Sequence, residues 1–219
     1  MKIASDWEFA LPLDVVADQT RKRKQPLQER ARVTVDAILE ATLQLLLSDG
    51  GVAGLNGLNT TRIAARAGVS VGTLYQYFPD KKSLLMTIKT LYMERVMGAI
   101  HGLIVAQIGQ PLPLALRAII SGVIGIKTQN MDVTLAVQAA SDWPAVDAAM
   151  KAATLQLCEA MEALFIAADP EMAQPRTKAT VLVSAVDGAI HAAIAADPAL
   201  LQDRAFQDSL IMLTLGFAH

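Results

Sequence analysis

The chain has 219 residues, of which 53% are hydrophobic and 18% are charged, and its formal net charge is −2. This composition buries enough apolar surface to offset the entropy lost on folding, which argues against a disordered chain. The length suits one small domain joined to one of medium size. The lone cysteine, Cys158, excludes an internal disulfide and fits a reducing compartment.

The hydrophobic content raises the question of a membrane span. The most apolar stretch, residues 98–126, is interrupted by His101, Arg117, two glutamines and two prolines, whereas a span needs about 20 predominantly apolar residues in succession. The first 20 residues carry four acidic side chains and lack the apolar core of a signal peptide. We therefore expect a cytoplasmic protein with no membrane partner.

Charge is segregated along the chain. Residues 1–19 carry one lysine against four acids, residues 20–82 carry ten Lys and Arg against five acids, and residues 83–219 carry eight against twelve. A basic segment attached to an acidic body is typical of a module that binds a polyanion, although an ordinary solvated basic face is the alternative.

The first part of the basic segment predicts an arm and a helix. Residues 1–19 show no period and are interpreted as an extension. The basic arm Arg21–Lys24 follows, and Pro26 ends it because proline disfavours a helix interior. Apolar residues spaced three and four apart then predict a helix from about residue 28 to residue 48, which Asp49-Gly50-Gly51 stops.

Two short helices are predicted next, over residues 61–67 and 71–77. Thr60-Thr61 is interpreted as the N-cap of the first helix, Gly68 as its left-handed end, and Ser70 as the N-cap of the second. Two short helices joined by such a turn have the geometry of a helix-turn-helix.

The rest of the chain is predicted to form helices separated by breaks at prolines. It lacks the alternation of apolar and polar residues that is typical of a strand. Asp80 is interpreted as the cap of the first of these helices. Their predicted ranges are 81–107, 114–128, 133–140, 145–167, 173–196 and 205–218.

The stretch TRIAARAGVSVGTLYQYFPDKKSLL, residues 61–85, resembles the DNA-binding signature of TetR-family transcription regulators. Residues 32–42 are similar to the first helix of that family. The resemblance implies an all-α fold of about nine helices: an extension with a basic arm over residues 1–26, a three-helix DNA-binding domain over residues 27–82, and a helical ligand-binding and dimerisation domain over residues 83–219. It also implies a repressor that a small apolar ligand releases from an inverted-repeat operator.

The resemblance and the chemistry of DNA together indicate which residues contact it. Phosphates need donors at fixed positions, and base edges need short side chains on a helix in the major groove. Thr61 and Ser70 stand at helix starts, where each serves either a phosphate or only as a cap. By resemblance, Tyr75 and Tyr77 present hydroxyls to phosphates. The candidate DNA-binding residues are Thr61, Ser70, Val71, Gly72, Thr73, Tyr75, Gln76, Tyr77, Lys81, Arg21, Lys22, Arg23 and Lys24.

The family reads double-stranded DNA with two recognition helices, which implies a homodimer on half-sites about 34–36 Å apart or a multiple of that distance. By resemblance the last two helices pack with their copies as a four-helix interface. Completion of the monomer core is the alternative role of their apolar residues. The candidate interface residues are Val181, Leu182, Ala185, Ile190, Leu210, Leu213 and Phe217.

The helices between are apolar and carry few charges, so a cavity among them would take a mainly apolar ligand. The candidate ligand-binding residues are His101, Gln138, Trp143, Cys158 and His191. Each has a structural alternative; His191, for example, is four residues after Asp187 and can pair with it. No cofactor and no metal site is expected.

The resemblance implies a switch in which ligand binding pivots the helix that begins at Lys81 and separates the two recognition helices, with a coupling of about 1–3 kcal/mol. An activator or a ligand-independent regulator with the same DNA-binding head remains open. An architectural DNA binder would need a basic chain throughout. An enzyme is not expected, because the sequence offers no glycine-rich phosphate loop, metal-ligand spacing or nucleophile elbow.

Overall fold

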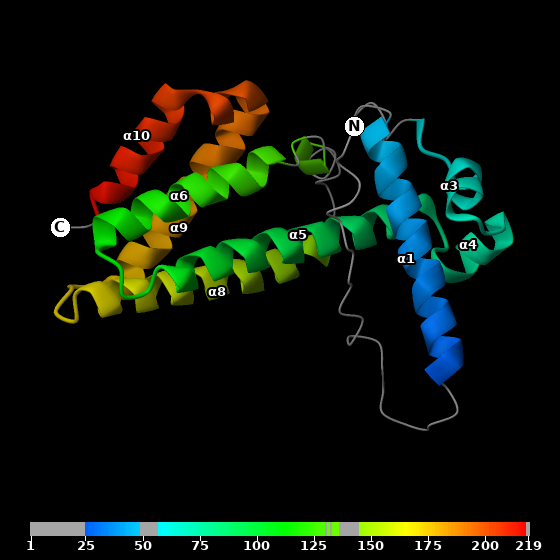
Figure 1. The fold of residues 1–219 in the computed structure, drawn as a ribbon, viewed down its shortest axis with the longest axis horizontal. Coiled ribbons are helices and arrows are strands. Elements are labelled where there is room, and N and C mark those ends of the chain that lie inside the picture. The colour runs from blue at the N-terminus through cyan, green and yellow to red at the C-terminus, as the bar shows by residue number, and fades with distance from the viewer. Residues whose placement is uncertain (1–24, 49–56, 130, 132, 136–144, 218–219) are drawn as a thin grey trace. The chain divides into compact units, whose positions relative to one another are not determined.

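The computed structural model describes residues 25–48, 57–129, 131, 133–135 and 145–217 (Figure 1). Within these ranges the chain forms eight α-helices and one 3-10 helix and no strand, which confirms the all-α fold. The chain separates into two compact units that meet between Ile88 and Lys89, inside a single helix. The sequence-based boundary after residue 82 stays a prediction.

The first unit contains α1 (Gln25–Ser48), α3 (Thr60–Ala67), α4 (Val71–Tyr77) and the start of α5 (Lys81–Ala106). Every helix of the unit contributes to its core, and α1 contributes the most buried apolar residues. The short helices α3 and α4 gain most of their stability from this packing. The largest fully buried side chains of this unit are Ile38, Leu39, Ile63, Leu74 and Leu84. Contacts between α1 and α3 and between α3 and α4 hold the unit together.

Several helix starts differ from the sequence-based prediction. The helix that begins at Leu112 is predicted from residue 114, and the one that begins at Pro175 is predicted from residue 173; in both, proline lies in the first turn, where its missing N–H costs nothing.

The helix α1 begins at Gln25 rather than near residue 28, because Pro26 lies in its first turn, where a missing N–H costs nothing. The cap of α3 is Asn59 rather than Thr60-Thr61: Asn59 has extended backbone angles, and its side chain accepts a hydrogen bond from the backbone N–H of Arg62 at 2.8 Å.

The turn between α3 and α4 follows the prediction. Gly68 has a φ of 69°, in the left-handed region, and its N–H and that of Val69 reach back to carbonyls of α3. Ser70 caps α4 by accepting a hydrogen bond from the N–H of Thr73 at 2.9 Å. The two helices and their turn form a helix-turn-helix.

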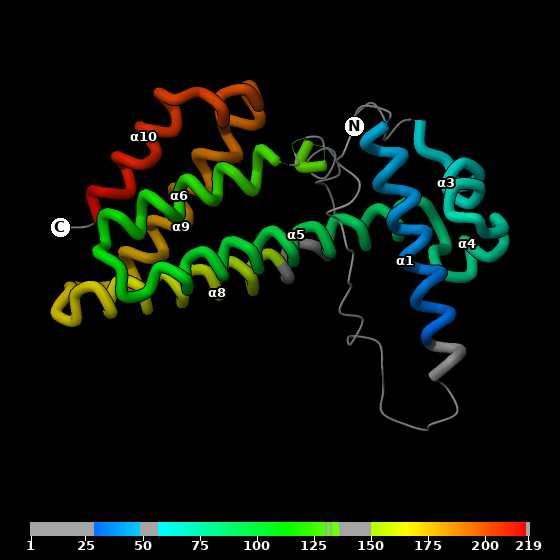
Figure 2. The backbone as a smooth tube through the Cα atoms, viewed as in Figure 1, coloured from blue at the N-terminus to red at the C-terminus, as the bar shows by residue number. Residues whose placement is uncertain are grey.

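The second unit contains the rest of α5 together with α6 (Leu112–Gln129), α8 (Ala145–Ala168), α9 (Pro175–Ala196), the 3-10 helix η1 (Pro198–Gln202) and α10 (Arg204–Leu215). The helix α8 packs along α9, and α10 packs on α6 (Figure 2). The sequence analysis missed η1. Of the helix predicted over residues 133–140, residues 133–135 are helical, and the remainder lies outside the described residues.

The helix α9 is the one described helix that is long and apolar enough to cross a membrane by length and composition. This is weak evidence, since a helix that packs on a protein core passes the same test. One face of α9 is buried in the second unit, and its buried residues are Ala179, Leu182, Val186, Ile190, Ala193 and Ile194.

Replacing Gly68 and Gly72 separately by alanine tests the geometry of the turn. Gly68→Ala forces a side chain into the left-handed region and should lower the free energy of unfolding by about 1–2 kcal/mol. Gly72→Ala is the matched control, because Gly72 lies inside α4 and an added Cβ would lie 3.7 Å from the Ser70 hydroxyl oxygen. This substitution should raise the free energy of unfolding by about 0.5–1 kcal/mol. Urea unfolding followed by circular dichroism measures both changes. Equal changes in the free energy of unfolding of the two variants would contradict a left-handed Gly68.

Candidate nucleic-acid interface and internal cavity

The helix α4 has one face in the core and one in solvent. Leu74 is completely buried, and Phe78, which follows the helix, is 6% exposed. Gly72 and Gln76 are exposed on the opposite face, and Tyr75 and Tyr77, on its two flanks, are exposed by 47% and 37%. The helix is thus anchored from one side and offers a continuous surface on the other.

The start of α4 is held by side-chain hydrogen bonds. Besides capping the helix, the Ser70 hydroxyl is hydrogen-bonded to the Thr73 hydroxyl at 2.8 Å. Both side chains are exposed or half-exposed, so their remaining lone pairs and protons face solvent. Val71 is half-buried beside them. A short, exposed and pre-ordered helix end of this kind suits contact with another macromolecule.

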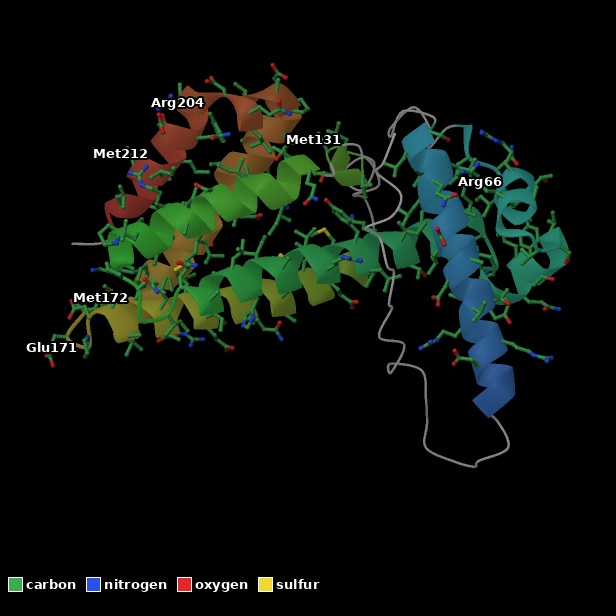
Figure 3. The ribbon with its side chains drawn as sticks, viewed as in Figure 1. Arg66, Met131, Glu171, Met172, Arg204 and Met212 are labelled. Carbon is green, nitrogen blue, oxygen red and sulfur yellow. The ribbon has the colours of Figure 1, made fainter. Side chains whose placement is uncertain are left out.

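Polar contacts orient the flanks of α4. The hydroxyls of Tyr75 and Thr60 lie 3.3 Å apart, which ties the exposed phenol to the start of α3. The Arg66 guanidinium donates from Nε to Oε1 of Gln44 at 2.9 Å and so links α3 to α1 (Figure 3). Sequence reasoning missed the Thr60–Tyr75 contact, because nothing in the spacing of the two residues indicates it.

The helix α5 begins directly after this surface. Asp80 caps it by accepting a hydrogen bond from the N–H of Ser83 at 2.6 Å, as the sequence predicts, and Lys81 is its first residue. The predicted contact residues from Thr61 to Lys81 therefore lie on α3, on α4 and at the start of α5, within one compact unit. The basic arm Arg21–Lys24 lies outside the described residues.

The second unit contains a cavity of about 230 Å³, partly open to solvent, between α5, α6, α8 and α9. Its lining is mostly Ile, Leu, Val and Met side chains. The polar or charged lining residues are Lys127, Thr154, Ser184 and Asp187. Such a site, with apolar walls and a few polar groups, has the form of a small-molecule pocket.

Lys127 is the buried charge of this cavity. It is 6% exposed, and burial lowers the pKa of its ammonium, an effect that the nearby Asp187 carboxylate opposes. Burial also acts to raise the pKa of Asp187, but the hydrogen bond and charge of His191, together with the charge of Lys127, leave it below its usual value. His191 Nδ1 lies 3.1 Å from Asp187 Oδ1, and this hydrogen bond raises the pKa of the imidazole.

The candidate ligand-binding residues are scattered. His101 is exposed on α5, and Cys158 is buried on α8; neither is among the cavity-lining residues. His191 contacts the lining residue Asp187 instead of lining the cavity itself. Gln138 and Trp143 lie outside the described residues. The signal that sequence reasoning missed is Lys127, which continues the inward spacing of Leu116, Ile120 and Val123 along α6.

The candidate interface residues divide by exposure. Leu182, Ile190 and Leu210 are buried within the second unit, whereas Val181 and Leu213 are about half exposed. Ala185 and Phe217 are partly exposed.

Comparison with known proteins gives two family matches. A model described as bacterial regulatory proteins of the tetR family matches residues 38–88, and one described as the tetracyclin repressor-like C-terminal domain matches residues 111–217. No curated protein matches the chain.

Solved structures show the same fold at low sequence identity. A TetR-family transcription regulator from Shewanella sp. PV-4 is 22% identical, with a TM-score of 0.54 over 84% of this chain and 96% of that one. A TetR-like regulator from Rhodococcus sp. RHA1 is 18% identical, with a TM-score of 0.57 over 83% and 93%. A TetR-family regulator from Streptomyces coelicolor is 19% identical, with a TM-score of 0.54 over 84% and 96%.

Proposed function

Because the chain belongs to the TetR family of transcription regulators, we propose that it is a repressor that binds an inverted-repeat operator as a homodimer and that a small, mainly apolar ligand releases it. Regulators of this family bind DNA and typically act as dimers. The observation that carries the proposal is the exposed face of α4, held on a buried anchor between two capped turns.

In the proposed complex α4 lies in the major groove. Gly72 lets the helix approach the base edges closely, and Val71 and the methyl group of Thr73 suit contact with thymine methyl groups. The hydroxyls of Tyr75 and Tyr77 serve phosphates on the flanks. The Thr60 contact supports this role for Tyr75, since it fixes the phenol before DNA arrives.

The other proposed contacts surround the helix. Thr61 lies exposed at the start of α3, where backbone N–H groups and the hydroxyl suit a phosphate. The Ser70 hydroxyl makes two hydrogen bonds with Thr73 and keeps one further hydrogen-bonding position for a phosphate. Gln76 is exposed and suits a base or a phosphate. Lys81 and the arm Arg21–Lys24 add positive charge for the DNA backbone.

A helix of seven residues reads few base pairs, so two copies are needed for specificity. The exposed faces of α9 and α10 support a dimer through these helices. One row of exposed residues on α9 recurs every three or four positions: Thr177, Val181, Ser184, Gly188 and Ala192. Two of them, Ser184 and Gly188, also line the cavity. On α10 the exposed Met212 and Leu213 supply apolar area (Figure 3). Such faces pack as a four-helix bundle.

The proposed switch runs through α5. This helix begins at Lys81 in the DNA-binding unit, and its later residues Met93, Met97, Ile100 and Ile104 line the cavity. A ligand that favours one position of these residues also biases the start of the same helix. Release of DNA then requires only that the ligand bind one of the two forms more tightly.

Neutralising Lys81 tests the phosphate contact. Lys81→Gln should lower the affinity for every DNA sequence and reduce the slope of log affinity against log salt by about 1, because one counterion fewer is released. Lys151→Gln is the control, since Lys151 is exposed on α8 in the second unit. Fluorescence anisotropy over a salt series gives both slopes, and a Lys81→Gln slope equal to the wild-type slope would remove the residue from the interface.

Selection of bound DNA from a random pool tests the proposed function as a whole. The expected product is an inverted repeat whose half-sites are one helical turn or a whole multiple apart. Placing the selected site over a promoter should then lower expression of a reporter gene when the protein is present. A selected sequence without two-fold symmetry would contradict the dimer, and higher expression would favour an activator over a repressor.

A further inference from the structure

The cavity of the second unit contains a charge that its apolar walls do not explain. Lys127 stands at an inward position of α6, one turn after Val123, where the preceding inward residues are all aliphatic. Burying an ammonium among apolar side chains costs free energy unless an anion compensates it. A methionine or leucine at this position would fill the same space without that cost.

Asp187 carries the one carboxylate among the cavity-lining residues that the structure describes, and it is only partly available to Lys127. Asp187 lines the cavity from α9, but its carboxylate is engaged by His191 at 3.1 Å, and its side chain is 57% exposed. A solvated carboxylate that is also hydrogen-bonded to an imidazole compensates a buried ammonium weakly. The cavity therefore favours a further anionic group close to Lys127 Nζ.

The rest of the lining sets the shape of the molecule that would bring this group. Four helices contribute aliphatic and thioether side chains. Methionines adapt to flexible apolar chains, and the cavity is lined by Met93, Met97, Met150 and Met161. A cavity of about 150 Å³ holds benzene. At the same volume per non-hydrogen atom, a cavity of 230 Å³ accommodates about nine such atoms.

We propose that this cavity binds a medium-chain carboxylate, whose apolar chain lies among α5, α6 and α8 and whose carboxylate pairs with the ammonium of Lys127. A cation of the same length would be repelled by Lys127, and a neutral molecule would bring no anionic group to the ammonium. The assignment of this carboxylate as the effector rests on the proposed function, whereas its binding does not.

Calorimetry on the full-length protein tests the ligand class with octanoate, octanol and octylamine as probes. The wild type should bind octanoate at least tenfold more tightly than octanol, and octylamine more weakly still. Equal affinities for octanoate and octanol would overturn the proposal. This comparison requires no variant.

Two variants then assign the preference to Lys127. Lys127→Met keeps the approximate volume and removes the charge, so octanoate affinity should fall at least tenfold while octanol affinity stays the same or rises. Lys151→Met, an exposed position on α8, should match the wild type. Lys127→Arg keeps the charge and should keep the preference for octanoate. Unchanged octanoate affinity in Lys127→Met would overturn the role of this residue.

A DNA-binding measurement separates this proposal from the proposed function. Octanoate should weaken binding to the selected operator in the wild type but not in Lys127→Met. If octanoate binds through Lys127 and leaves DNA affinity unchanged, the ligand class stands and ligand-released repression is wrong. If octanoate does not bind while the protein still binds its inverted repeat, the ligand class is wrong and the DNA-binding function stands.

Discussion

The packing of Leu74 and Phe78 under α4 is the constraint on which the rest of the protein depends. A helix of seven residues does not persist in water by itself, because helices shorter than about 12 residues are marginal even with favourable sequences. Full burial of Leu74 contributes about 1.5–3 kcal/mol, and the Ser70 cap contributes about 1 kcal/mol more. Burial of one face of α4 thus keeps the whole helix folded, including its exposed face. Every proposed base contact depends on that arrangement.

In the second unit, too, one helix uses its two faces for different purposes. The helix α9 presents one apolar face to α8 and the core, and a second face of small residues to solvent. Because neither face carries many charges, α9 is apolar enough by composition to cross a membrane. The helix α5 is shared in another way, since its first turns belong to the DNA-binding unit and its later turns line the cavity.

Features fixed by local chemistry were predictable from the sequence. The bounds of α4, the left-handed Gly68 and the caps Ser70 and Asp80 depend on residues within a few positions, and the structure confirms them. The missed start of α1 and the missed cap Asn59 also have local causes, namely the tolerance of a first helical turn for proline and the strength of asparagine as a cap.

Features that depend on distant residues could not be read in this way. The contact between Thr60 and Tyr75 and the burial of Lys127 arise only when helices pack. The spacing along α6 places Lys127 inward, but a long side chain at such a position can also reach solvent, so spacing alone did not decide its burial. For the same reason the sequence alone could not separate the core residues of α9 and α10 from those available for an interface. The structure separates them by exposure: Leu182 is buried, whereas Val181 is about half exposed.

The most direct test of the account is to find where α4 lies on DNA. The one native cysteine, Cys158, is buried, so Gln76→Cys provides an exposed thiol on α4 for an attached iron chelate that cuts nearby DNA. On the selected operator we expect two clusters of cuts related by two-fold symmetry and separated by about 10 base pairs or a multiple of that. Lys151→Cys with the same reagent should give neither cluster. Bound DNA that the Gln76→Cys protein leaves uncut, or cuts at one place alone, would contradict an α4 that enters the groove twice.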